Sequence, residues 1–120
     1  MGTVFQLIPG PNSTWQENVL YSFRGGTDGS FPTATLVFDA TGALYGTTST
    51  GGRPSCDCGT LFKMTLERGS WNEKIVHFFG KGRDGSSPSY GLSPDADGNL
   101  YGTTPVGGTE GQGAVFRLTP

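Results

Sequence analysis

Charged and titratable side chains are scarce in this chain of 120 residues. Lysine and arginine together number eight, aspartate and glutamate ten, and there is a single histidine. The basic residues are scattered, and a net charge of −2 supplies no positive patch of the kind that binds nucleic acid. No apolar run approaches the ~20 residues that a membrane-spanning helix needs. We therefore expect no nucleic-acid partner and no membrane insertion, and no signal-peptide pattern opens the chain.

Cysteine is almost absent, occurring only in the sequence Cys56-Asp57-Cys58. Two thiols could supply half of a zinc site, but His77 is the single histidine and no further thiol exists. In a secreted protein such a pair favours a disulfide, and free thiols are the alternative. We therefore treat Cys56 and Cys58 as a disulfide candidate and expect no metal site and no cofactor.

Glycine and aromatic residues are abundant instead. The chain contains 21 glycines, eight phenylalanines, four tyrosines and two tryptophans. Disordered chains are usually rich in charge and poor in aromatics, so this composition indicates a folded domain with many tight turns. The aromatic side chains offer a large hydrophobic surface for burial.

A tandem repeat of about 56 residues organises the chain, and such repeats decide the fold. The motif at residues 2–7 returns at 59–64 and again at 113–118, and Leu-Tyr-Gly-Thr-Thr at 44–48 recurs unchanged at 100–104. Further residues recur at the same spacing: Trp15 and Trp71, Glu17 and Glu73, Phe23 and Phe79, Asp28 and Asp84, Asp39 and Asp95. We divide the single domain 1–120 into repeat units 2–58 and 59–112, with a third unit starting at 113–120.

Each repeat contains four segments with the two-residue alternation of β-strands. In the second copy, Trp71, Glu73, Ile75, His77 and Phe79 are expected to share one face of a strand. No stretch of ten residues has helical periodicity without glycine or proline. The sequence therefore predicts an all-β fold.

Four short antiparallel strands per repeat are typical of propeller blades. Taken from the innermost strand outward, the predicted order is 36–39, 44–48, 60–65 and 71–79. Pro94 fits the innermost position of the next blade, because proline is tolerated at a sheet edge. The chain then supplies about two blades and one surplus strand, whereas a propeller needs roughly four or more. We expect a homo-oligomer, or a longer parent chain with further repeats, to complete the ring.

Four motifs in fixed order carry a family resemblance: Gly-Thr-Val-Phe, Trp-x-Glu-x-Val-Leu-Tyr-x-Phe, Asp-Gly-x-x-Pro and Gly-x-Leu-Tyr-Gly-Thr-Thr. Together they resemble the GloVer-type, or choice-of-anchor, tandem repeat of bacterial surface proteins, over essentially all 120 residues. The resemblance implies an extracellular or cell-surface location and an extended array of propeller-like repeats. It implies no enzymatic activity.

Two interpretations compete for the repeated tryptophans. As packing residues, we expect a buried aromatic set: Trp15, Phe23, Tyr45, Phe62, Trp71, Phe79 and Tyr101. As ligand-binding residues, the tryptophans would stack on a sugar while neighbouring charged groups bind its hydroxyls. That site would use Trp15, Glu17 and Arg24 in one copy and Trp71, Glu73 and Arg83 in the other.

No catalytic residues are predicted. Asp95-x-Asp97-Gly98-Asn99 resembles the start of a calcium loop, but the distal glutamate is missing and we predict a turn. We expect a non-enzymatic repeat module that acts as a scaffold or binds a ligand, with itself or further repeats as partner. The alternatives are an oligomeric propeller lectin with a glycan ligand, and a small hydrolase acting at the propeller mouth.

Overall fold

The computed structural model describes all 120 residues as an all-β chain, as predicted. Helix is confined to two single turns of 3-10 type, η1 (Pro11–Ser13) and η2 (Gly26–Asp28), and no helix has the length and apolar character of a membrane span. The strands are β1 (Gly2–Pro9), β2 (Trp15–Phe23), β3 (Val37–Phe38), β4 (Leu44–Thr48), β5 (Thr60–Glu67), β6 (Ser70–Phe78), β7 (Ser93–Pro94), β8 (Leu100–Thr104) and β9 (Ala114–Leu118).

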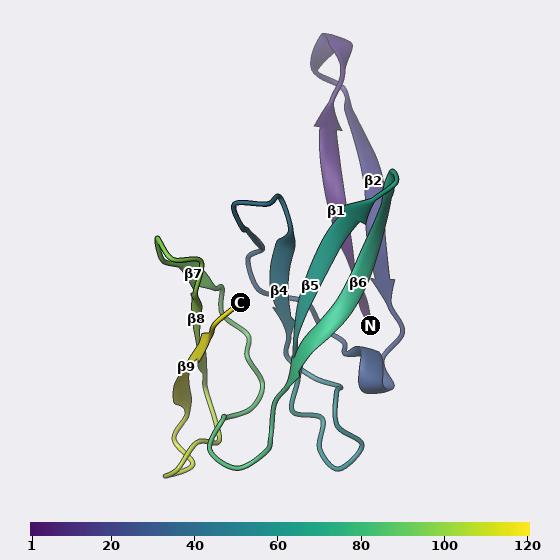
Figure 1. Ribbon diagram of the computed structural model, residues 1–120. Helices are drawn as coiled ribbons and strands as arrows, with labels where there is room; N and C mark the ends of the chain where they lie inside the picture. Colours follow the sequence, from purple (N-terminus) through teal and green to yellow (C-terminus); the bar gives the residue numbers. More distant parts are fainter.

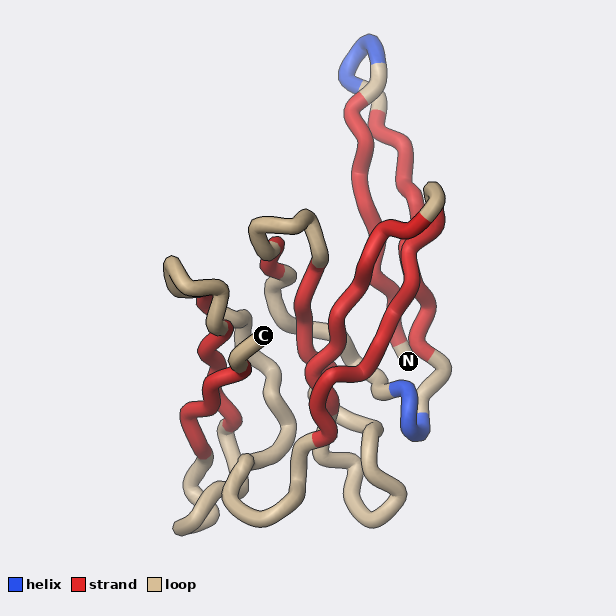
Figure 2. Tube along the Cα trace, in the orientation of Figure 1, coloured by secondary structure: helices blue, strands red, loops and turns tan.

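The strands form three antiparallel sheets, none of which closes on itself (Figures 1 and 2). The first sheet is the hairpin β1–β2, the second has the order β3-β4-β5-β6, and the third has the order β7-β8-β9. The strand order of the second sheet is the order predicted from the sequence. Pro94 lies in β7, which pairs with β8 alone, so the missing amide donor falls at an edge.

A β-bulge divides each long outer strand into two parts. In β6, Ile75 pairs with Phe62 but His77 pairs with Leu61, so Val76 has no partner across the sheet. The extra residue shifts the alternation, which places Trp71 and Ile75 on one side of the sheet and Phe79 on the other. The predicted common face from Trp71 to Phe79 is therefore wrong. The same bulge recurs in β2.

Two hydrophobic cores fill the spaces between consecutive sheets. The first interface, between the first and second sheets, contains Val4, Phe23, Leu44, Phe62 and Met64. The second interface, between the second and third sheets, contains Ala43, Tyr45, Leu61, Phe79, Leu92 and Leu100. Alternate residues of β4 and β5 thus serve different cores, which is the two-residue periodicity of a strand buried on both faces.

Gly46 explains the glycine in the repeated Leu-Tyr-Gly-Thr-Thr motif. A methyl group on Gly46 would lie 2.6 Å from the ring of Phe62, which crosses this strand. Gly102 occupies the same position beneath Phe116. The glycine is needed because the aromatic ring of the neighbouring strand lies directly on the backbone.

The predicted burial of the aromatic residues is correct for one part of the set and wrong for another. Tyr45, Phe23, Phe62 and Phe79 are buried and Trp71 is half-buried. Trp15 is 64% exposed and Tyr101 is 38% exposed. Trp15 lies near the free end of the β1–β2 hairpin, and Tyr101 lies in the last sheet. Each lacks the neighbouring sheet that covers its counterpart in the other repeat.

Candidate functional site

Asp28 closes the turn that follows β2. One oxygen of its carboxylate accepts a hydrogen bond from the hydroxyl of Tyr21 at 2.7 Å, and the other accepts one from the backbone NH of Arg24 at 2.7 Å. The repeated Asp-Gly pair therefore does more than form a turn, because the aspartate carboxylate also binds a side chain of β2. Burial and then the bond to Asp28 raise the pKa of Tyr21.

Asp84 repeats this arrangement after β6. Its carboxylate lies 2.8 Å from Nε2 of His77 and accepts hydrogen bonds from the backbone NH groups of Gly80 and Lys81 at 3.1 and 2.9 Å. Tyr21 and His77 are equivalent residues of the repeat, and both contact the equivalent aspartate. The substitution of histidine for tyrosine retains the polar contact.

Glu73 adds a second carboxylate to the first of these sites. It lies on β6, which packs against β2 across the first interface. Its Oε1 atom is buried and has no hydrogen-bond partner. Burial raises the pKa of Glu73 to about 7, and the nearby carboxylate of Asp28 acts in the same direction. We refer to Tyr21, Asp28 and Glu73 as the carboxylate cluster.

The second interface contains the equivalents of Tyr21 and Asp28, which are His77 and Asp84, but no residue equivalent to Glu73. Beside His77 and Asp84 lies a cavity of about 150 Å³, and its apolar walls are Leu61, Phe79, Phe116 and Leu118. Leu118 occupies the strand position equivalent to Met64, which pairs with Glu73 in the second sheet. The cavity therefore lies where a residue equivalent to Glu73 would stand on a fourth strand of the third sheet.

The predicted sugar-binding groups do not converge in this structure. Trp15 begins β2 and Arg24 follows its last residue, which separates them by about 30 Å at the usual rise of ~3.3 Å per residue. Trp71 likewise lies near the start of β6, and Arg83 lies beyond its end. Glu17 is exposed two residues from Trp15, whereas Glu73 belongs to the carboxylate cluster.

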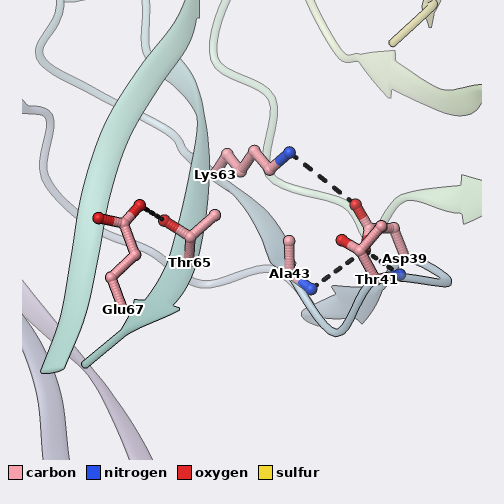
Figure 3. A network of polar contacts seen from close by, with 6 residues as sticks. All are labelled: Asp39, Thr41, Ala43, Lys63, Thr65 and Glu67. Carbon is pink, nitrogen blue, oxygen red and sulfur yellow. Dashed lines mark hydrogen bonds and ion pairs between the residues drawn. The ribbon is translucent and has the colours of Figure 1, made fainter. Parts of the chain in front are cut away.

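The aspartates before the short hairpins form turns. Oδ1 of Asp39 accepts hydrogen bonds from the backbone NH groups of Thr41 and Ala43 at 2.8 and 3.0 Å (Figure 3). The Thr41 hydroxyl bonds the same oxygen, and this bond is the main cause of the lowered pKa of Asp39. Asp95 makes the equivalent bonds to Asp97 and Asn99. The segment that resembles a calcium loop is thus a turn, as predicted.

Cys56 and Cys58 are joined by a disulfide in the loop between β4 and β5. Cys58 packs against the second core, and both sulfur atoms lie over Gly80. Gly80 is one of the residues whose backbone NH binds Asp84. No group of three histidine, cysteine, aspartate or glutamate side chains is placed to hold a metal ion.

Repeated strands, repeated turns and two equivalent interfaces define an all-β tandem-repeat protein. The chain belongs to the Gloeobacter/Verrucomicrobia repeat family, which it matches over residues 1–120. The resemblance inferred from the sequence motifs is thereby confirmed. No curated protein and no solved structure matches the chain.

Sequence reasoning missed the carboxylate cluster, although its members were visible as repeat pairs. The motifs alone suggest a sugar site for Glu73, and strict alternation places Tyr21 and His77 on the same face as the tryptophans. The bulge at Val76 places His77 on the opposite side of the sheet from Trp71, and the equivalent bulge in β2 does the same for Tyr21 and Trp15. No residue type at these positions indicates a bulge. The signal that could have found them is the coincidence of Tyr or His with an aspartate seven residues later in both copies.

Proposed function

We propose that this chain is a non-enzymatic module of a β-propeller array, in which each sheet is one blade and the array serves as a scaffold on a secreted or cell-surface protein. The observation that carries the proposal is the equivalence of the two interfaces. The same repeat positions meet in both, including the edge-to-face pairs Phe23–Phe62 and Phe79–Phe116. A contact that recurs with the repeat can be extended to further units.

The second sheet supports the blade assignment. Its four strands are antiparallel and follow one another along the chain, and its two faces pack against different sheets. The shortest strand, β3, forms one edge, and the nine-residue strand β6 forms the other. In a propeller the short edge would lie near the axis and the long edge at the rim.

A scaffold role is supported by the structural tasks of the aspartate side chains. Asp39 and Asp95 hold turns, while Asp28 and Asp84 fix the ends of outer strands. These roles recur in both repeats, and a single active site seldom employs the same residue in the same structural task twice. The buried apolar side chains lie at the contacts between sheets.

Joining copies of the chain in tandem tests this proposal. If the sheets are blades, proteins of one, two and three joined copies should unfold with increasing free energy per copy, because each junction adds an interface. Urea unfolding followed by tryptophan fluorescence measures this, and small-angle scattering shows whether the protein of three copies is compact. A matched series carrying Phe5→Ala in every copy should lose most of the gain, because Phe5 is 52% exposed in a single copy and would be covered only at a junction. Independent unfolding of each copy, with no gain in stability, would contradict the proposal.

A further inference from the structure

Comparison of the two interfaces shows which part of the second is missing. In the first interface, Phe62 and Met64 are fully buried, at 0% exposure, because β6 pairs with β5 and brings Trp71 and Ile75 over the core. Their counterparts Phe116 and Leu118 remain half-buried. The third sheet has no strand beyond β9, and the cavity beside His77 and Asp84 occupies that place.

The β1–β2 hairpin carries the complementary surface. Phe5 and Leu7 are the repeat counterparts of Phe62 and Met64, yet they are 52% and 51% exposed. Trp15 and Val19, the counterparts of Trp71 and Ile75, are also exposed. All four belong to the face of the hairpin that has no neighbouring sheet. Glu17, the counterpart of Glu73, is exposed on the same strand.

We infer that the β1–β2 hairpin of a second copy of this chain takes the place of β9 beside β8 and completes the third sheet. β1 and β9 carry the same motif, Gly-Thr-Val-Phe and Gly-Ala-Val-Phe, so β1 can make the pairing that β9 makes. The incoming hairpin then supplies the outer strand, β2, that the third sheet lacks. Phe5 replaces Phe116 against Phe79, and Glu17 enters the cavity beside His77 and Asp84.

The incoming hairpin can be accommodated if β9 is released from β8, and this needs fewer residue pairs to be broken than separation of β1 from β2 would. β8 and β9 are joined by five residue pairs, whereas β1 and β2 are joined by eight. Release of β9 keeps the hairpin intact, and the pairs lost between β8 and β9 are regained between β8 and β1. The gain is the burial of four large apolar side chains that are now in water, and this burial drives the association. The inference rests on the proposed function, because it treats the sheets as equivalent blades.

Cysteine cross-linking between two chains tests the register of this pairing. Tyr101 pairs with Arg117 of β9 in the structure, and the counterpart of Arg117 in β1 is Gln6. In a Cys56→Ser, Cys58→Ser background, a chain with Tyr101→Cys is mixed with a chain carrying Gln6→Cys under mild oxidation. We expect a disulfide-linked heterodimer. Asn18→Cys in place of Gln6→Cys is the matched control, since Asn18 lies opposite Gln6 on β2 and should not reach Tyr101.

Association in solution supplies a second readout. Phe5→Ala should weaken dimerisation by about tenfold or more, because it removes an exposed aromatic ring that the association would bury against Phe79. Phe38→Ala is the control, because Phe38 is an exposed phenylalanine of β3 that takes no part in the proposed pairing. A chain that stays monomeric at high concentration, or that associates without the Tyr101–Gln6 cross-link, overturns the inference. The joined copies test the proposed function separately, because their added stability does not depend on contact between separate chains.

Discussion

The ring of Phe23 meets the ring of Phe62 edge to face, with centroids 5.0 Å apart and planes inclined by 65°. Phe79 and Phe116 adopt the same geometry at the second interface, with the same separation and the same angle. Edge-to-face contact is favourable for aromatic rings beyond the area they bury. The recurrence indicates that each interface is specified by the residues of one repeat and the next.

Truncation of the central ring should therefore be costly. Phe62→Ala removes a fully buried side chain that contacts Phe23, and we expect a loss of about 3–5 kcal/mol in the free energy of unfolding. Urea denaturation measures the change. Phe38→Ala is the matched control, because Phe38 is 63% exposed and its truncation should cost far less. Similar losses for the two variants would show that Phe62 does not organise the core.

Gly46 should not tolerate a side chain. Gly46→Ala places a methyl group against the Phe62 ring, and overpacking of this kind costs about 1–3 kcal/mol. The double variant Gly46→Ala, Phe62→Leu should cost less than the sum of its two single variants, because the smaller side chain makes room. Thermal and urea unfolding of the parent, the two single variants and the double variant give the four free energies of unfolding. If the losses of the two single variants simply add in the double variant, Gly46 and Phe62 are not in contact.

Glu73 should make stability fall as pH rises. Its pKa is about 7 in the folded chain and near 4.5 when exposed, so the folded chain binds more protons between these values. The free energy of unfolding should then decrease from about pH 4.5 to about pH 7 by the contribution of this residue. Glu73→Gln should reduce that slope and stabilise the chain above about pH 7, whereas Glu17→Gln should not. Urea titrations at several pH values measure this dependence. The same pH dependence in Glu73→Gln as in the parent would show that the carboxylate cluster is not formed.

The disulfide should contribute little to stability. The bond between Cys56 and Cys58 closes a very short loop and so restricts the unfolded chain far less than the ~3 kcal/mol expected for a 15-residue loop. The second repeat joins the equivalent strands without cysteine. We expect the double variant Cys56→Ser, Cys58→Ser to melt within a few degrees of the parent in oxidising buffer. A large drop, reproduced by a chelator in the parent, would instead indicate a metal bound by this pair.

Local features were predicted well because their causes lie within a few residues. Asp39 and Asp95 could be recognised as turn residues, since each bonds backbone groups two and four positions ahead. The strand order of the second sheet followed from four alternating segments joined by short turns. Both results needed only the sequence of one repeat.

The exposure of Trp15 and the position of His77 could not be predicted in this way. Burial of a tryptophan at this repeat position depends on the sheet next to it, and Trp15 has no such neighbour. His77 reaches the second interface because one unpaired residue, Val76, shifts the alternation of β6. A shift of one residue is invisible in composition and periodicity, yet it decides which groups meet.

The bulge at Val76 also makes the two sides of the sheet different from each other. The part of β6 before the bulge contributes to the interface with the preceding sheet, and the part after it contributes to the interface with the following sheet. The two sides of each sheet therefore carry different residues and cannot be exchanged. Units built in this way add with one polarity, because one side of a sheet always meets the opposite side of the next sheet, and a contact between two like sides cannot reproduce this interface.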